Sequence, residues 1–241
     1  IKCWKWSPLE NFVFYFNKYT FCPCADLLKF IVLALSITSF ICYSQNPSTS
    51  SSTVENALQQ KEALMQNSLV KNIAFSNIGP TVMSGRVTDL AVSPENPTEF
   101  YVAYASGGLW HTINNGTTFT PILDNSNTQN VGDIAVDWKN KTIWVGTGEN
   151  NSSRSSYAGI GILKSTDNGK TWQNVGLKDS HHIGRILINP NNPNEVTVGV
   201  TGHLYSANKE RGIYKTTDGG KTWSQTLFVD DMSGIILIQF S

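Results

Sequence analysis

The feature that most constrains this chain is an octapeptide that recurs at nearly constant spacing. Its copies are TINNGTTF at 112–119, STDNGKTW at 165–172 and TTDGGKTW at 216–223. Their third residues are Asn114, Asp167 and Asp218, so the intervals are 53 and 51 residues. A module of about 50 residues therefore repeats, and repeats of this length are typical of propeller blades and solenoids.

Short apolar segments keep the same phase as the octapeptide. Each unit opens with one such segment, and the three are VTDLAV at 87–92, VGDIAV at 131–136 and IGRILI at 183–188. EFYVAYA, TIWVGTG and EVTVGVT follow as second strands, and GLWHT, GILKST and GIYKTT as thirds. The segment after each octapeptide, such as 173–177, predicts a fourth strand. Four short strands per unit predict an all-β fold, a β-propeller built of four-stranded antiparallel blades.

The repeats also predict the domain organisation. We expect blades at about 75–124, 125–178 and 179–230, with the start of a further blade at 231–241. Propellers close with roughly four to eight blades. About three blades make an incomplete ring, so we expect the chain to be part of a longer protein.

The octapeptide has the residues that a tight turn between a third and a fourth strand requires. The Asp167 carboxylate can accept from N–H groups one or two residues on, Gly169 can take a positive φ, and Trp172 can re-enter the core. Catalytic or calcium-binding aspartates are the alternative, but Asp167 and Asp218 belong to separate blades and neither turn has enough oxygen ligands for calcium. The predicted scaffold residues are Asn114, Gly116, Phe119, Ser165, Asp167, Gly169, Thr171, Trp172, Thr216, Asp218, Gly220, Thr222 and Trp223.

The first 72 residues differ in composition from the repeats. Residues 1–26 fit neither a leader nor a domain and are interpreted as upstream or non-native sequence. Residues 27–44 predict a signal peptide cleaved after Ser44, because the apolar run 30–43 would span only about 21 Å as a helix, too short for a stable membrane span. Residues 45–72 predict a polar linker and a short amphipathic helix over about 53–70. These features predict a secreted, periplasmic or cell-surface protein.

Charge and cysteine usage exclude several classes of partner and linkage. The chain has 18 basic and 18 acidic residues and no net charge, which does not favour nucleic acid. All four cysteines precede residue 45, so no disulfide can link the blades. We predict no cofactor and no metal, and an extracellular or periplasmic protein, peptide or glycan as partner.

Candidate ligand-binding residues lie on the face opposite the octapeptide turns, where the longer loops 149–159 and 203–212 are expected. The candidates are Asp89, Asp133, Arg185, Glu149, Arg154, Tyr157, His181, His182, His203 and Arg211. The aspartates and Arg185 occupy equivalent repeat positions near the expected central channel. Alternatively, they pair across neighbouring blades as structural partners, and the adjacent histidines form a solvated loop that lacks a third metal ligand.

Several runs of this sequence resemble the Asp-box, or bacterial neuraminidase repeat, β-propellers, most closely the sortilin-type domains of large bacterial exported proteins. The resemblance covers 75–223 and rests on the octapeptides and on IGPTVMSGRVTDLAV, YASGGLW, WVGTGENNSSRSSYAGIG, DSHHIGR and GHLYSANKERGIYKTT. Because sortilin-type relatives bind peptides and proteins, the resemblance implies an exported binding module.

The alternative function is a glycoside hydrolase that would use Asp89, Asp133 or Glu149. Xyloglucan-cleaving relatives carry an aspartate in a run resembling RTDIGG, whereas this chain has Ala105 at that position. Sialidases need three arginines and a Tyr/Glu pair, and that set cannot be assigned here. The resemblance therefore favours binding over catalysis.

Overall fold

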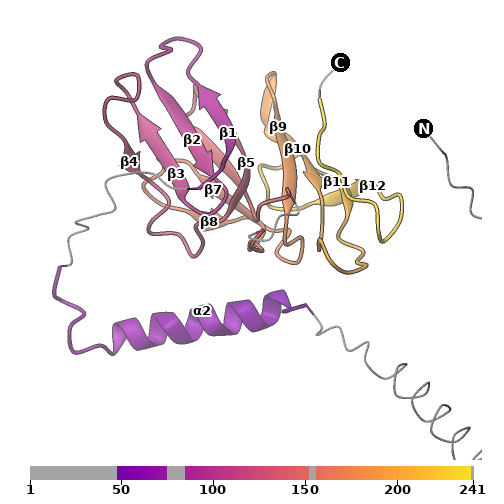
Figure 1. Ribbon diagram of the computed structural model, residues 1–241, viewed down its shortest axis with the longest axis horizontal. Helices are drawn as coiled ribbons and strands as arrows, with labels where there is room; N and C mark the ends of the chain where they lie inside the picture. The colour runs from indigo at the N-terminus through magenta and orange to yellow at the C-terminus, as the bar shows by residue number, and fades with distance from the viewer. Residues whose placement is uncertain (1–47, 75–84, 152–155, 240–241) are drawn as a thin grey trace, which may run out of the picture. The chain divides into compact units, whose positions relative to one another are not determined.

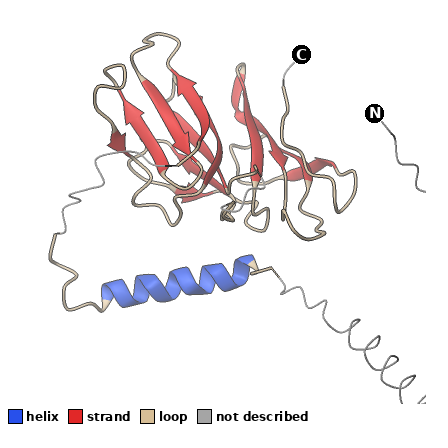
Figure 2. Cartoon of the chain, in the orientation of Figure 1, coloured by secondary structure: helices blue, strands red, loops and turns tan. Residues whose placement is uncertain are grey.

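The computed structural model describes residues 48–74, 85–151 and 156–239, all within one compact unit that spans 48–241. The predicted upstream segment 1–26, the predicted signal peptide 27–44 and Arg154 lie outside the described residues. Within those ranges the chain forms three four-stranded antiparallel sheets and one helix (Figures 1 and 2).

Each sheet keeps its strands in sequence order, as a simple meander. The strands are β1 (Val87–Val92), β2 (Phe100–Tyr104), β3 (Gly108–Thr112), β4 (Thr120–Pro121), β5 (Val131–Asp137), β6 (Thr142–Thr147), β7 (Ile162–Ser165), β8 (Gln173–Asn174), β9 (Ile183–Asn189), β10 (Asn192–Val200), β11 (Gly212–Thr216) and β12 (Ser224–Leu227). The first strands of successive sheets, β1, β5 and β9, are neighbours. This arrangement confirms the predicted fold class, a β-propeller with three four-stranded blades.

The outer strand of the second blade is shorter than the predicted segment 173–177. β8 ends at Asn174, and the chain then leaves the extended conformation at Gly176 and Leu177, whose φ angles are 120° and 53°. The Asn174 Oδ1 accepts a hydrogen bond from the Gly176 N–H at 3.0 Å. This local side-chain bond stabilises the bend that ends the strand.

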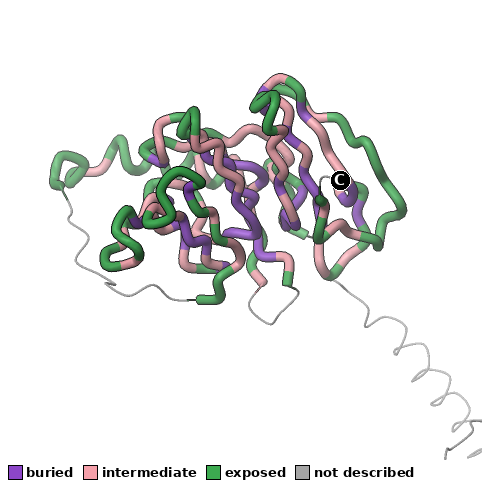
Figure 3. Tube along the Cα trace, turned by 90° about the horizontal axis from the view of Figure 1, so that it is seen from above, coloured by how far each residue is buried: buried purple, intermediate pink, exposed green. Residues whose placement is uncertain are grey.

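The core lies between neighbouring blades, because each middle strand buries both of its faces. In β6, Ile143 and Val145 belong to the cluster shared with the first blade, whereas Trp144 belongs to the cluster shared with the third. Successive side chains of a strand point to opposite faces, so one strand supplies both clusters. Figure 3 shows the buried residues concentrated along these strands.

The helix α2 spans Ser51–Gln66, which is shorter than the predicted 53–70. Ser50 is its N-cap, since the Ser50 hydroxyl accepts from the Thr53 N–H at 3.3 Å. The helix ends before Asn67 and Ser68, and the Ser68 hydroxyl accepts from the Val70 N–H, a local bond that competes with helix continuation. No helix of the described ranges is long and apolar enough to cross a membrane.

Candidate functional site

The octapeptide turn between β7 and β8 is organised by the Asp167 carboxylate. Its Oδ1 accepts from the Lys170 and Thr171 N–H groups at 3.1 and 2.9 Å and from the Ser165 hydroxyl at 2.7 Å. Its Oδ2 accepts from the Thr171 hydroxyl at 2.6 Å. The backbone N–H donors are therefore three and four residues on, rather than the one or two predicted. These bonds, above all those from Thr171, lower the pKa of Asp167 to about 2.

The other two octapeptides repeat this geometry. Asp218 accepts from the Thr222 N–H at 3.0 Å and from the Thr222 hydroxyl at 2.6 Å, which hold its pKa well below the ordinary value. Asn114 does the same without a charge: its Oδ1 accepts from the Thr118 N–H at 2.9 Å, and its Nδ2 donates to the Thr118 hydroxyl at 2.9 Å. An amide therefore forms the same turn as a carboxylate.

The octapeptide tryptophans reach from one blade to the preceding blade. The indole Nε1–H of Trp172 donates to the Ile122 carbonyl at 2.8 Å, and that of Trp223 donates to the Val175 carbonyl at 2.7 Å. Both rings are partly buried and pack against the two hydrophobic core clusters, so they join two blades at the edge of the core. Phe119, the equivalent residue of the first octapeptide, has no side-chain N–H. Its ring packs edge-on against Phe100 of its own blade, with ring centroids 6.0 Å apart.

The structure brings Asp89, Asp133 and Arg185 together across three blades. The Arg185 Nη1 lies 3.0 Å from the Asp133 Oδ1 and 3.6 Å from the Asp89 Oδ1. The Asp133 Oδ2 also accepts from the Ile186 N–H at 2.7 Å, and the Asp89 Oδ2 accepts from the Ile134 N–H at 3.3 Å. Each aspartate thus binds the backbone of the next blade, which is the structural pairing that the sequence left open as an alternative.

Asp133 is an unusual member of this cluster because only 2% of its surface is exposed. Burial, with the negative charge of Asp89 as the next cause, raises the pKa of Asp133 to about 8, although Arg185 and the Ile186 N–H act in the opposite direction. One proton is therefore held by a cluster of two carboxylates and one guanidinium.

This proton predicts a pH dependence of stability. The folded chain keeps it up to about pH 8, whereas an unfolded chain releases it near pH 4, so the contribution of Asp133 to stability should fall as the pH rises from 4 to 8. The slope is at most about 1.4 kcal/mol per pH unit. Asp133→Asn should flatten it, as urea unfolding at pH 5 and pH 8 will show. Equal slopes for both proteins would contradict the buried proton.

Glu149 is fully buried and paired with an arginine that the sequence analysis did not single out. Its Oε1 accepts from the Arg86 Nε at 2.8 Å, and its Oε2 pairs with the same guanidinium. The side chains of Asn151 and Ser156 donate to the two oxygens as well. Arg86 directly precedes β1 within the run that carries the resemblance, but nothing local in the sequence indicates a partner 63 residues away.

Two predicted ligand-face residues lie in the interior instead. Arg211 is 4% exposed and donates to the carbonyls of Thr201 and Asp231 at 2.7 and 3.0 Å. His182 is also 4% exposed, its Nδ1 lies 3.0 Å from the Gly202 carbonyl oxygen, and burial lowers its pKa to about 4. Both side chains hold loops to the third blade, because the loop after β10 folds back over them.

The remaining candidates are accessible but dispersed. Tyr157 is exposed, and the imidazole rings of His181 and His203 stack with their centroids 3.7 Å apart. Among the described residues, no group of three or more histidine, cysteine, aspartate or glutamate side chains is arranged to hold a metal ion. The predicted residues therefore form two partly buried clusters of carboxyl groups and arginines and one histidine stack, not a single site.

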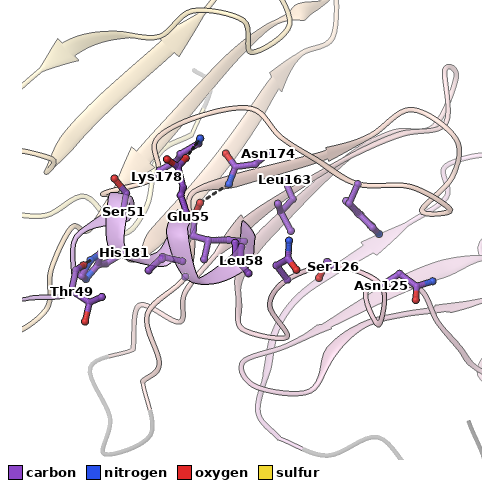
Figure 4. A pocket seen from close by; sticks show the side chains of 15 residues that line it. Thr49, Ser51, Glu55, Leu58, Asn125, Ser126, Leu163, Asn174, Lys178 and His181 are labelled. Atoms are coloured by element: carbon purple, nitrogen blue, oxygen red, sulfur yellow. Dashed lines mark hydrogen bonds and ion pairs between the residues drawn. The ribbon is translucent and has the colours of Figure 1, made fainter. Parts of the chain in front are cut away.

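A cavity of about 200 Å³ does open beside the histidine stack (Figure 4). Blade residues around it include Ile160, Leu163, Trp172, Asn174 and His181, and α2 supplies the rest of its wall. No local sequence signal indicates this cavity, since its lining comes from the linker helix, two links between blades and two strands of the second blade.

No protein-family model matches the chain. It is similar to a probable oligoxyloglucan-reducing end-specific xyloglucanase of Neosartorya fischeri, with 28% identity over 153 residues, 56% of this chain and 17% of that protein. It is also similar to the vacuolar protein sorting/targeting protein 10 of Kluyveromyces lactis, with 35% identity over 77 residues, 30% of this chain and 4% of that protein. The chain thus spans less than a fifth of the length of either relative.

Among solved structures, an ancestral GH74 enzyme superposes with a TM-score of 0.47 and 24% identity. The superposition covers 61% of this chain and 19% of that enzyme.

Proposed function

We propose that this chain is an exported binding module that takes up a protein, peptide or glycan through the face opposite its octapeptide turns. The observation that carries the proposal is that the three acidic residues on which catalysis would depend are already bound to other groups of the chain. Asp89, Asp133 and Glu149 are each bound to an arginine and to other donors, and two of them are buried. The cavity beside α2 instead combines apolar side chains with a few polar and charged ones, which is typical of a binding site.

The similarity to the sorting/targeting protein supports binding, and the similarity to the xyloglucanase supports the second candidate, a glycoside hydrolase. Asp133, whose raised pKa suits a general acid, favours the latter. Its burial weighs against that role, because a general acid must contact the glycosidic oxygen.

A direct experiment separates the two functions. The purified chain is incubated with reducing-end-labelled xyloglucan oligosaccharides and with a library of short peptides, and bound and released species are read by native mass spectrometry. The proposal expects a retained ligand and no new reducing ends, both for the wild type and for Asp133→Asn. Release of labelled sugar that is lost in Asp133→Asn would establish the hydrolase instead.

The octapeptide residues are proposed to be scaffold, and Asp167 offers a matched test. Asp167→Ala removes both carboxylate acceptors of the turn and should lower the melting temperature. Asp167→Asn should stay close to the wild type, because Asn114 already makes this turn with an amide. Ligand retention should be unchanged in both variants at a temperature where they are folded. Loss of the ligand in a fully folded Asp167→Asn variant would identify the carboxylate as functional.

Export is proposed from the predicted signal peptide at residues 27–44. Sequencing the N-terminus of the natural secreted protein should give a start at Gln45. A natural protein retained in the cytoplasm with residues 27–44 intact would refute export.

A further inference from the structure

The first two turns of α2 present four side chains on one helical face. Ser51, Val54, Glu55 and Leu58 follow the spacing i, i+3, i+4 and i+7, and all four line the cavity of the second blade (Figure 4). This spacing is the usual anchor pattern of a helix bound in a groove. α2 therefore contacts the second blade through this face, in addition to linking the N-terminal segment to the blades.

Polar side chains of the link between β8 and β9 bind the beginning of the helix. Asp179 accepts from the Ser51 N–H at 2.9 Å and from the Ser51 hydroxyl at 2.8 Å, so its negative charge lies at the positive end of the helix. Lys178 pairs with Glu55 one turn further along. The His181 Nε2 lies 3.3 Å from the carbonyl oxygen of Thr49, just before the helix.

The remainder of α2 contributes little to this contact. No residue of the helix is buried, and Leu64 and Met65 are 73% and 60% exposed. The polar contacts at the helix start are themselves exposed, where ion pairs and hydrogen bonds are weak. The apolar anchors Val54 and Leu58 are only half-buried. A short contact of this kind is reversible.

We propose that the blade surface that forms the other wall of this cavity is a docking site for an amphipathic helix, and that α2 is the resident helix, which a partner helix displaces. The partner carries a hydroxyl at its first turn, apolar residues at positions i+3 and i+7, and an acid at i+4 that meets Lys178. The inference rests on the proposed binding function and narrows its ligand to a helical protein segment. Asp179 and Lys178 select the start and the direction of the bound helix.

The test uses the full chain and a synthetic, fluorescently labelled peptide of residues 48–67. In the wild type, tethered α2 competes at an effective concentration in the millimolar range, so the peptide binds weakly. In a full chain that carries Val54→Ser and Leu58→Ser the resident helix is released, and the peptide should bind at least about tenfold more tightly by fluorescence anisotropy. The same two substitutions placed in the peptide should abolish binding to either chain.

A charge reversal checks the orientation of the bound helix. Lys178→Glu, added to the Val54→Ser, Leu58→Ser chain, should weaken binding of the natural peptide by about threefold, and a Glu55→Lys peptide should recover it. Lys178 and Glu55 are both about half exposed, so neither change disturbs the core. Recovery by the reversed peptide is not expected from non-specific binding to an exposed apolar surface.

Two outcomes overturn the docking site: equal binding of natural and doubly substituted peptides to the released chain, or equal affinity of the natural peptide for wild-type and released chains. The oligosaccharide and peptide-library assay runs on the same samples. If that assay retains a ligand while the peptide of residues 48–67 fails, the binding function stands and only the helix site is wrong. If neither the ligand-retention assay nor the peptide of residues 48–67 shows binding, the proposed binding function is wrong as well.

Discussion

Replacing Gly148 with alanine is expected to lower the free energy of unfolding by about 3 kcal/mol or more, or to prevent folding altogether. A Cβ atom at this position would lie 1.8 Å from the His181 carbonyl oxygen and 2.7 Å from the Gly159 nitrogen. Both atoms belong to the backbone and cannot rotate away. The residue also has a φ of +83°, which an alanine adopts only with strain.

Gly116→Ala is the matched control, because it isolates the strain of positive φ from the clash. Gly116 has a φ of +80°, but a Cβ there meets nothing closer than the Phe119 ring at 3.5 Å. We expect a loss of about 1 to 2 kcal/mol, measured by urea unfolding of both variants. Equal losses at the two positions would mean that the blades do not approach each other at Gly148 as described.

The second large effect is expected from Trp144→Ala, which should cost about 3 to 5 kcal/mol. Trp144 is fully buried between the second and third blades, and its ring meets Trp223 edge-on with centroids 6.4 Å apart. Its indole nitrogen has no hydrogen-bond partner among the described residues, so the loss reflects packing and the contact of the ring with the Lys164 ammonium group, 4.5 Å from the ring centroid. The measurement is again urea unfolding.

Trp144→Phe serves as the control, since it keeps an aromatic ring and should cost less than half as much. A second measurement on the same variants is the NMR signal of the Trp223 indole N–H, which should shift in Trp144→Ala because the two rings are in contact. A loss below about 1 kcal/mol for Trp144→Ala would place this side chain outside the core.

The strands could be predicted because their signals are local and repeated. Short apolar segments such as 142–147 indicate a strand, and three copies in the same phase specify the blade. The outer strand of the second blade is shorter than the predicted segment 173–177 for an equally local reason. Positive φ angles at Gly176 and Leu177 end the second blade's outer strand early, and a single leucine gives no sign of that conformation.

The candidate site was harder to predict because its members are set by long-range contacts. Polar residues in long loops predict side chains that face solvent, yet Arg211 donates to carbonyls of its own loop and Glu149 is bound by Arg86. The Asp89, Asp133 and Arg185 cluster could be predicted, since equivalent positions in neighbouring repeats must come close. The docking of α2 could not, because its partners Lys178 and Asp179 lie more than 120 residues away.

The central structural claim is that the second and third octapeptides each join their blade to the preceding blade. Hydrogen exchange at the indole N–H groups of Trp172 and Trp223 tests this directly, with each NMR signal assigned through its Trp→Phe variant. Because each N–H donates to a carbonyl of the preceding blade, both should exchange on the order of 100-fold or more slowly than free tryptophan. Exchange of either group at the free rate would contradict the link.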